Sequence, residues 1–434
     1  MKLTVTLAIA AATALSAGAQ TWSLDSCIAY AVNHNLTVKT REINTVSAEY
    51  DITEAKDRFL PNVNFGASQS FSFGRGLTSE NTYANRNTSN LGWQASLNLP
   101  IFQGLRNVRN LDYAKTNFRA ALAQLESAKD DIALNVMAQY LQCLYYDEMH
   151  KVALEQVRMS QVELDRRRDL LANGKIAEVE VLQAESQLAQ DELSAVNALN
   201  NKTLGLLDLA QMLELPDTQG FDISPLDTES PLPILNAEDV YRAALTVNNS
   251  IAAQRLQVES AAKYVKVAQS GWLPTLSFNA GIGSNYYTMS GMKSEGFGAQ
   301  MRHNLSKSLG FSLSVPIFDA FSTRNSVRKA RIQQINARLQ LTDAQNRVYK
   351  AIQQAYTQAI AAEKSKASSA QACTATAAAL EAMREKYNYG KANSTEFEQA
   401  KSAYIKAVSD SVQAKYESVL RRRILDFYYT GTRF

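Results

Sequence analysis

The residue types that most often carry out chemistry are sparse in this chain of 434 residues. It has only three histidines, His34, His150 and His303. No HExxH pair, GxSxG elbow or phosphate-binding loop accompanies them. Gly281 and Gly283 begin a GxG motif, but the third glycine is missing and the surrounding pattern is that of a strand. The sequence therefore predicts no catalytic residue, no metal ligand and no cofactor site, and we expect that the protein is not an enzyme.

Cysteine usage and charge narrow the class of protein further. The three cysteines, Cys27, Cys143 and Cys373, lie at wide, irregular intervals that fit neither a disulfide framework nor a zinc site. We expect each of them to be buried in a helix. Two arginine triples, at 166–168 and 421–423, are typical of solvated helix faces. With 45 Lys and Arg against 42 Asp and Glu, the chain lacks the basic excess of a nucleic-acid binder, so no nucleic acid is expected as a partner.

The first nineteen residues predict a secretory signal peptide. Lys2 precedes an apolar run over residues 3–15, and the small residues Ala17, Gly18 and Ala19 follow, so cleavage is expected after Ala19. Beyond this segment no run of 18 or more apolar residues could form a membrane-spanning helix. If the exported chain enters a membrane, we expect it to do so with strands.

Proline and glycine indicate where long helices lie. The chain has 8 prolines and 18 glycines, which is low for its length. Residues 101–215 and residues 317–434 contain no proline. At 1.5 Å per residue, each of these stretches is long enough for a helix of about 100 Å. Gly174 and Gly390 interrupt the two stretches. Each glycine is predicted to form the tip of a hairpin between two antiparallel helices.

The landmarks of the first half of the chain recur in the same order in the second half. Leu60 and Pro61 recur as Leu273 and Pro274, Pro100 to Phe102 as Pro316 to Phe318, and Gly174 with Lys175 as Gly390 with Lys391. Three such coincidences predict a tandem duplication. The first repeat would cover residues 20–213 and the second residues 237–434. Between them, residues 214–236 hold four of the eight prolines and are predicted to be the linker.

Each repeat contains two segments in which apolar and polar residues alternate, the pattern of a strand. The predicted strands are 62–73, 91–100, 275–287 and 308–316, and long outward loops are expected at 74–90 and 288–307. Aromatic residues such as Phe71 and Phe311 belong to one face, and serine, asparagine and glycine to the other. These lengths suit strands that cross a bilayer around a water-filled lumen. A half-buried sheet in a soluble protein would give the same alternation.

Four strands are too few to close a barrel by themselves. About eight is the smallest number that closes one, and open sheet edges are not tolerated in lipid. Strands in a membrane would therefore have to be shared among several chains. The helix after the first tip carries two apolar stripes, one through Val179 and Leu182 and one through Val181 and Leu188. Two stripes indicate neighbours on both sides of the helix, either in a ring of helices or in an ordinary bundle.

The order of signal peptide, helix, strand pair and long helical hairpin, with the last three repeated, resembles the outer membrane efflux protein family of TolC-like channels. The resemblance covers the mature chain and rests on Asn35 before Leu60 and Pro61, the echo of Asn248 before Leu273 and Pro274, the two Pro-Ile-Phe steps and the two glycine tips. It implies an α+β membrane protein that forms a homotrimer in the outer membrane of a Gram-negative bacterium. Four transmembrane strands from each chain would form one shared β-barrel. The long α-helical hairpins would form a coiled-coil tunnel in the periplasm, with the linker around it.

The same resemblance implies roles for residues at the tips. A periplasmic adaptor (membrane fusion) protein and an inner-membrane pump of RND, ABC or MFS type would join the channel there. The tip residues are Asn173, Gly174, Lys175, Tyr389, Gly390 and Lys391. Glu180 and Glu396, each six residues beyond a tip glycine, match the acidic ring that narrows the entrance of similar channels. Ala392 stands where those channels carry an arginine, so Arg384 or Lys391 is the expected substitute in closing the entrance.

Two functions from different classes follow from these observations. The first is a passive outer membrane channel of a tripartite efflux or type I secretion system, surrounded by outer membrane lipid. The alternative is a periplasmic coiled-coil spacer that forms no channel. For the channel, the sequence leaves drugs, metal ions and polypeptides open as cargo.

Overall fold

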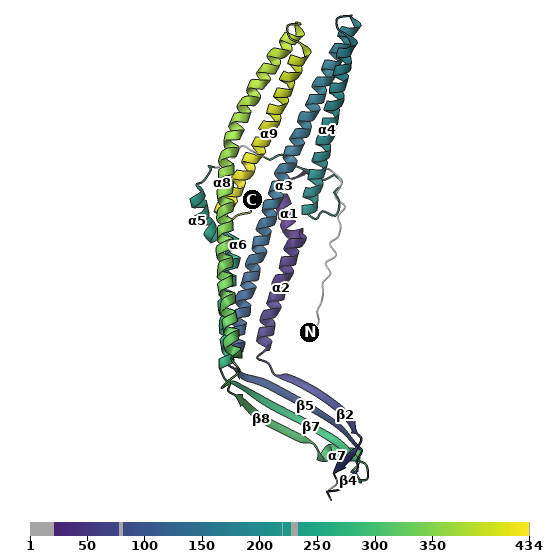
Figure 1. Ribbon diagram of the computed structural model, residues 1–434, viewed down its shortest axis with the longest axis vertical. Helices are drawn as coiled ribbons and strands as arrows, with labels where there is room; N and C mark the ends of the chain where they lie inside the picture. Colours follow the sequence, from purple (N-terminus) through teal and green to yellow (C-terminus); the bar gives the residue numbers. More distant parts are fainter. Residues whose placement is uncertain (1–20, 78–80, 219, 227–232, 434) are drawn as a thin grey trace. The chain divides into compact units, whose positions relative to one another are not determined.

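The structure, a computed structural model, describes residues 21–77, 81–218, 220–226 and 233–433 (Figure 1). It divides into two compact units, which are described separately. The sheet unit contains Arg41–Leu125 and Ser250–Gln345, and the hairpin unit contains the remainder of the chain. The expected signal peptide, residues 1–19, lies outside the described residues.

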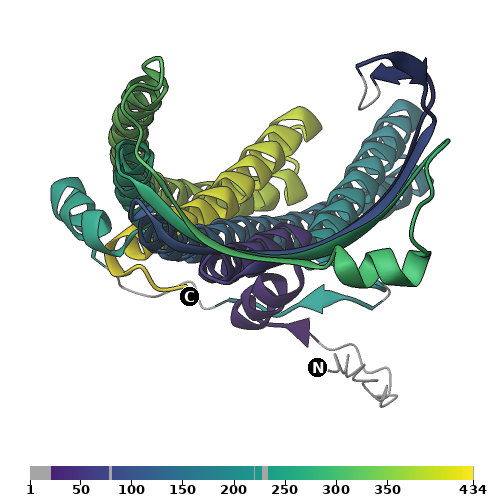
Figure 2. The same cartoon turned by 90° about the horizontal axis from the view of Figure 1, so that it is seen from below.

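The sheet unit is built on one antiparallel sheet of four long strands in the order β2, β5, β7, β8. Their bounds are Asn62–Ser72 for β2, Thr88–Gln103 for β5, Thr275–Met289 for β7 and Ser306–Ser314 for β8. The alternating segments of both repeats thus form strands, and β5 and β7 extend further than the alternation predicted. The four strands lie side by side in Figure 1, and Figure 2 shows that the sheet is curved. β2 and β8 form its two edges.

The register of the strands separates two faces with different chemistry. Phe65 of β2 pairs with Ala95 of β5 on one face, whereas the preceding residue Asn64 pairs with Ser96 on the other. Because successive side chains of a strand point to opposite faces, this alternation continues across the sheet. Aliphatic and aromatic side chains gather on one face, and serine, asparagine, glutamine and glycine on the other. The predicted two-faced sheet is confirmed.

The connections between the strands of each repeat, which were expected as loops, contain short elements. In the first connection β3 (Arg75–Leu77) pairs with β4 (Tyr83–Asn85). In the second, residues Phe297–His303 form α7. Elements of three to seven residues are too short to show a readable hydrophobic period, which is why the sequence did not predict them.

Each repeat enters its long helix through two consecutive residues with positive φ. In the first repeat these are Gly104 (60°) and Leu105 (62°), and in the second Ala320 (53°) and Phe321 (63°). A left-handed backbone costs a residue with a Cβ about 1–2 kcal/mol. Three of the four positions are therefore strained. The number of residues between the first pair and the second equals the number between the two tip glycines, so the pairs occupy equivalent positions in the repeats.

Helical segments from both repeats pack together in the sheet unit. They belong to α2 (Leu36–Asp57), α3 (Arg106–Ala172), α6 (Asn249–Gln269), η1 (Ser270–Trp272) and α8 (Ser322–Asn388). The Arg109 guanidinium donates a hydrogen bond of 2.8 Å to the Lys266 carbonyl. Lys263 Nζ lies 2.7 Å from Asp112 Oδ2. Polar contacts thus join α3 of the first repeat to α6 of the second.

The hairpin unit contains the two predicted helical hairpins (Figure 1). The first consists of α3 and α4 (Glu178–Met212), and the second of α8 and α9 (Ser394–Thr430). Residues 173–177 and 389–393 form the turns between the helices of each hairpin. The hairpins predicted from Gly174 and Gly390 are confirmed. No described helix is both long and apolar enough to cross a membrane.

Short elements complete the hairpin unit. They are α1 (Leu24–His34), α5 (Ala237–Val247) and a two-stranded parallel sheet of β1 (Thr21–Trp22) and β6 (Asp222–Ile223). β6 lies within the predicted linker, whose described residues are therefore partly ordered as a strand. The hydroxyl of Tyr140, fully buried in α3, lies 2.6 Å from the carbonyl oxygen of Ser224. The linker is thus fastened to the core of the first hairpin.

The three cysteines lie in three different helices of the hairpin unit. Cys27 of α1 and Cys143 of α3 are fully buried in one hydrophobic cluster. Burial raises the pKa of each thiol to about 12. The expectation of a buried helical cysteine is confirmed for these two residues. It is wrong for Cys373 of α8, which is only partly buried.

Candidate functional site

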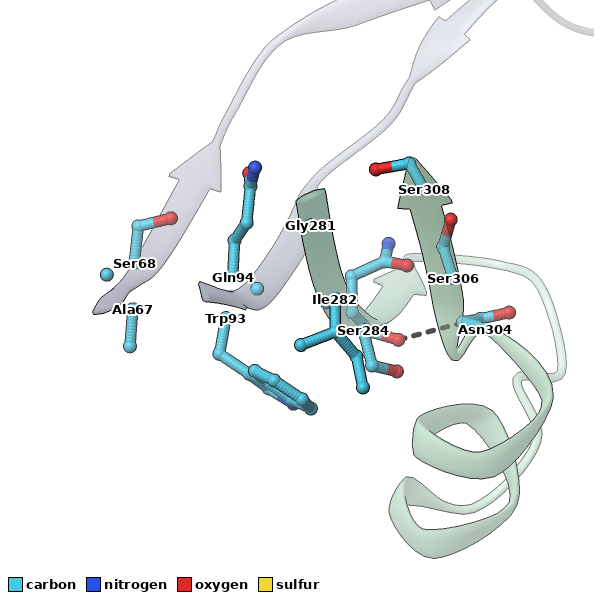
Figure 3. Close-up of a pocket in the computed structure, with 14 residues that line it drawn as sticks. Ala67, Ser68, Trp93, Gln94, Gly281, Ile282, Ser284, Asn304, Ser306 and Ser308 are labelled. Carbon is cyan, nitrogen blue, oxygen red and sulfur yellow. Dashed lines mark hydrogen bonds between the residues drawn. The ribbon is translucent and has the colours of Figure 1, made fainter. Parts of the chain in front are cut away.

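The polar face of the sheet is hollowed, and its chemistry is neutral. The hollow has a volume of about 600 Å³, and Figure 3 shows Ser68, Gln94, Ser306 and Ser308 pointing to this side. Every polar side chain that the register of β2, β5, β7 and β8 places on this face is uncharged. The face can therefore exchange hydrogen bonds with water or a polar solute without selecting for charge.

Two glycines that line this hollow have no room for a side chain. A Cβ on Gly281 would meet Ser308 Oγ at 2.9 Å, and a Cβ on Gly283 would meet the Trp93 carbonyl oxygen at 2.7 Å. Both glycines lie in β7, so their assignment to a strand is confirmed. Glycine at these two positions lets the neighbouring strands approach closely.

The opposite face of the sheet is apolar and exposed. Phe65 is 71% exposed and Phe311 is 72% exposed. The rings of Phe278 and Phe311, paired across β7 and β8, have centroids 5.2 Å apart. In Figure 3 Trp93 points away from the polar hollow. A contiguous apolar surface of this kind marks a contact with lipid or with another protein.

The two hairpin tips have the same backbone. Gly174 and Gly390 both have φ of +67°, and a Cβ on either would meet no atom within 4 Å. Gly174 N–H bonds to the Leu171 carbonyl (2.8 Å) and Lys175 N–H to the Leu170 carbonyl (2.9 Å). Equivalent bonds run from Gly390 and Lys391 to the carbonyls of Tyr387 and Lys386 in the second hairpin. This pair of bonds is the Schellman motif, which requires a left-handed residue and leaves the turn exposed.

The tip side chains named from the resemblance are mostly exposed. Asn173 donates to the Asp169 carbonyl of its own helix (2.7 Å). Tyr389 is 80% exposed, and Lys175 and Lys391 are also exposed. The structure therefore places the six predicted tip residues on two accessible turns. Within the described part of the chain, no side-chain hydrogen bond joins one of these six residues to another.

Glu180 and Glu396 occupy equivalent positions but make different contacts. Glu396 forms a capping box with Asn393, in which its carboxylate accepts from the Asn393 N–H (3.0 Å) and its own N–H donates to Asn393 Oδ1 (2.8 Å). Glu180 lies in the first turn of α4, and its carbonyl oxygen accepts from Arg167 (3.1 Å). A glutamate in the first turn is stabilised by the helix dipole in both hairpins. The carboxylate of Glu396 also has a structural partner.

A charged cluster near the tips joins the two hairpins. Glu163 Oε1 accepts from the Tyr387 hydroxyl (2.6 Å) and from Arg167 Nε (2.8 Å). The Arg166 guanidinium lies 4.4 Å from the centre of the Tyr387 ring. Burial, with the hydrogen bond to Glu163, raises the pKa of Tyr387 to about 12. Arg384, expected from the resemblance to take part in closing the entrance, is exposed and forms an ion pair with Glu381 of its own helix.

The expectation of a solvated face was wrong for Arg167, whose side chain is 4% exposed. Arg422 of the second triple also has a partner, because it lies 2.5 Å from Glu363 of α8. Charged runs at helical spacing usually face water. In the first triple all three arginines reach another helix of the hairpin unit, because Arg166 contacts Tyr387, Arg167 the Glu180 carbonyl and Arg168 the Glu185 carboxylate.

A second cluster joins the hairpins through a buried ion pair. Asp191 of α4 accepts from Ser160 and, at 3.4 Å, from Lys401 of α9. Gln156 (2.6 Å) and Gln187 (2.9 Å) donate to its other carboxylate oxygen. The side chains of Asp191 and Lys401 are each 3% exposed. Charges this deeply buried are tolerated because they are paired and hydrogen-bonded.

Neither cluster was predicted from the sequence, although α3 carries a signal for both. Gln156, Ser160, Glu163 and Arg167 follow one another on α3 at intervals of four, three and four residues. This spacing places them on one side of the helix. A polar stripe where a coiled coil carries apolar residues indicates a buried polar contact.

Known proteins similar to this chain share both its halves and its fold. The outer membrane efflux protein family matches residues 28–214 and 240–427. The outer membrane efflux protein BepC of Brucella suis biovar 1 is 24% identical over 405 residues, which cover 92% of this chain and 83% of that protein. The outer membrane protein TolC of Escherichia coli K12 is 23% identical over 379 residues, covering 86% and 74%.

Solved structures of outer membrane channels have the same fold. The CmeC outer membrane channel of Campylobacter jejuni aligns with a TM-score of 0.76 at 17% identity, over 94% of this chain and 85% of that one. CusC aligns with a TM-score of 0.78 at 14% identity, over 96% and 95%. The two family matches coincide with the two repeats seen in the strands and hairpins. This chain belongs to the outer membrane efflux protein family.

Proposed function

We propose that this protein is the outer membrane channel of a tripartite efflux or type I secretion system and acts as a passive conduit to the exterior. The observation that carries the proposal is the four-stranded sheet, with one exposed apolar face, one neutral polar face and two unpaired edges. In a membrane the apolar face would contact lipid, and the polar face would line a water-filled lumen. The similarity of both halves to efflux channels favours this function over a periplasmic spacer.

The unpaired edges and an open helix stripe support a homotrimer. Strand edges must be paired in lipid, and four strands from each of three chains would close one barrel. On α4, Val181 is buried within the chain, whereas Val179 and Leu182 of the other stripe are more than half exposed. An apolar stripe that the chain itself leaves uncovered is suited to a second copy.

Two substitutions at neighbouring positions test the membrane proposal. Phe311→Asp places a charge on the apolar face, at a cost of about 2 kcal/mol or more near the middle of a bilayer. Ser312→Asp is the matched control, because Ser312 pairs with Ser277 on the polar face. We expect the Phe311 variant to be absent from outer membrane fractions and the Ser312 variant to be present as a trimer by native mass measurement. Equal amounts of both in the membrane, or a stable wild-type monomer in detergent, would refute the proposal.

The tips are the proposed docking surface for a periplasmic adaptor that connects the channel to an inner-membrane pump. Their accessible turns and the exposed Tyr389, Lys175 and Lys391 support this role. The triple variant Tyr389→Ala, Lys175→Ala and Lys391→Ala changes only exposed side chains, so the trimer and its thermal stability should be unchanged. Export in cells and crosslinking to the adaptor should fall together. Full export by this variant would show that docking occurs elsewhere.

Glu180 and Glu396 are the proposed acidic ring of the tunnel entrance. In a trimer this pair would recur in each chain and attract cations. The double variant Glu180→Gln and Glu396→Gln should lower cation selectivity in planar bilayers and weaken block by multivalent cations. Because glutamine can keep the capping contact with Asn393, thermal stability should change little. Unchanged selectivity with reduced stability would assign both residues a structural role only.

A further inference from the structure

The connection between β7 and β8 places basic side chains beside the apolar face of the sheet. Lys307 of β8 pairs with Ile282 of β7, so the two side chains leave the sheet on the same, apolar face. Arg302 lies in α7, and the carbonyl of its neighbour Met301 accepts a hydrogen bond of 2.8 Å from Ser284. Ser284 is two residues beyond Ile282 and shares its face. Arg302 and Lys307 thus lie beside neighbouring residues of β7, at the point where its pairing with β8 ends.

The charge of this region is one-sided. Between residues 275 and 315 the chain has three basic residues, Lys293, Arg302 and Lys307, against one acid, Glu295. Glu295 lies 3.0 Å from the ring of His303. Arg302 and Lys307 are exposed, and neither forms an ion pair with any residue in the part of the chain that the structure describes. An anion from outside the chain would complement them.

Exposed rings accompany these cations. Phe297 of α7 is 53% exposed, and its ring packs edge-on against Tyr286 of β7 with centroids 5.3 Å apart. Figure 3 shows the short helix on the side of the sheet to which Trp93 and Ile282 point. Aromatic rings flank the apolar band of membrane barrels, and long basic side chains reach from its edge to the headgroups. The residues therefore have the composition of a rim between hydrocarbon and headgroups.

We propose that Arg302 and Lys307 bind the phosphate of membrane lipid headgroups at the rim of the apolar face. The inference rests on the proposed function, because it requires this face to lie in lipid. The aliphatic stem of Lys307 can follow the apolar face while its ammonium reaches the headgroup. The Arg302 guanidinium can hold a phosphate through two hydrogen bonds. A phospholipid satisfies both surfaces at once, since its phosphate meets the cations and its acyl chains cover the exposed apolar side chains.

If Arg302 and Lys307 bind headgroup phosphate, the protein should prefer an anionic phospholipid to a zwitterionic one. Quenching of tryptophan fluorescence by brominated lipid measures this preference. The chain has three tryptophans, and Trp22→Phe with Trp272→Phe leaves Trp93 as the reporter on the apolar face. The full chain is reconstituted in vesicles of brominated phosphatidylglycerol or brominated phosphatidylcholine. We expect phosphatidylglycerol to bind near Trp93 up to about thirtyfold more strongly, because each basic residue near an anionic surface contributes about fivefold. Arg302→Gln with Lys307→Gln should bring the ratio close to one.

Controls separate this inference from the proposed function. Lys364→Gln with Lys386→Gln removes the same charge from exposed positions of α8 and should keep the preference. Inorganic phosphate, added at constant ionic strength, should not reduce the preference for phosphatidylglycerol. If it abolishes that preference, Arg302 and Lys307 bind free phosphate rather than lipid, and the lipid proposal is overturned. Equal quenching of the Trp93 reporter by both lipids would overturn it as well, while the sheet would still be in lipid. Quenching by neither lipid would refute the membrane location and the inference together.

Discussion

The two helical hairpins occupy equivalent positions in the repeats and have closely similar backbones. α3 and α8 have 67 residues each, and both tips turn through a glycine at φ +67° with the same pair of hydrogen bonds. Their side chains differ where the hairpins meet. Asp191 pairs with Lys401, but the residues at the equivalent repeat positions are Ala407 and Glu185. Two identical hairpins could not form this contact.

The charged cluster near the tips shows the same divergence. Glu163 and Arg167 of α3 correspond to Ala379 and Met383 of α8, and Tyr387 corresponds to Leu171. The repeats therefore share the backbone that shapes a tip, and they differ in the side chains that join one hairpin to the other. Divergence of side chains on a shared backbone thus specifies how the two hairpins pair.

The largest expected effect is the loss of the buried ion pair between the hairpins. Lys401→Met leaves the Asp191 carboxylate buried without its cation, and we expect the free energy of unfolding to fall by about 3–5 kcal/mol. Urea unfolding in detergent, followed by circular dichroism, measures the change. Adding Asp191→Leu should restore much of the stability, because the remaining partner of Lys401, Glu398, is 30% exposed and can be solvated.

Lys406→Met is the matched control for this prediction. Lys406 pairs with Asp410 on the same helix, and their side chains are 76% and 53% exposed. A solvent-exposed pair contributes about 0–1 kcal/mol. If the Lys406 and Lys401 variants lose equal stability, the buried contact does not specify the pairing of the hairpins.

The strained turns between strand and helix provide the second comparison. A Cβ on Gly104 would meet the Ser270 carbonyl oxygen at 2.7 Å, so Gly104→Ala should cost about 2 kcal/mol or more through overlap and strain. The equivalent residue of the second repeat already carries a Cβ at φ 53°. Ala320→Gly should therefore stabilise the protein by about 0.5 kcal/mol. Effects of the same sign in both variants, measured by thermal unfolding, would show that the two turns are not equivalent.

A third prediction concerns the Tyr387 hydroxyl, which has no counterpart in the first repeat. Tyr387→Phe removes a hydrogen bond to the Glu163 carboxylate and should cost about 1.5 kcal/mol at neutral pH. Because the folded chain raises the pKa of Tyr387 from 10.0 to about 12, the neutral phenol is the stabilised form. Its contribution is complete below pH 10 and is lost as the pH rises towards 12. A difference between wild type and variant that persists at pH 12 would contradict this assignment.

The smallest expected effect distinguishes the two entrance glutamates. Glu396→Ala removes one arm of the capping box and should cost about 0.5–1 kcal/mol. Glu180→Ala removes a carboxylate without a capping contact and should lower thermal stability by about 0.5 kcal/mol or less through the helix dipole. Equal losses in the two variants would mean that the capping box contributes nothing measurable.

Much of the fold could be predicted because glycine, proline and alternation act locally. Gly174 and Gly390 lie at the predicted tips, since a left-handed residue ends a helix wherever it occurs. The alternation around Phe71 and Phe311 located two of the strands, because a side-chain period of two is visible in a single segment. Short elements such as α7 gave no such period.

The contacts between hairpins could not be predicted in the same way. Tyr387 and Glu163 are 224 residues apart in the chain, and nothing local links them. Arg167 and Lys401 have the composition of solvated residues, and only packing against another helix buries them. The polar stripe on α3 indicated that some polar contact existed. Which residues complete it depends on how two separate helices meet.

The unpaired edges of β2 and β8 determine how a mutant allele behaves in the presence of the normal one. In the proposed trimer each chain supplies an edge to both of its neighbours, so one chain that fails to pair leaves the whole ring open. When intact chains and chains defective at only one of the two edges are made in equal amounts and mix at random, about one trimer in eight contains intact chains alone. A single defective allele in a cell that also carries the normal one would therefore be dominant.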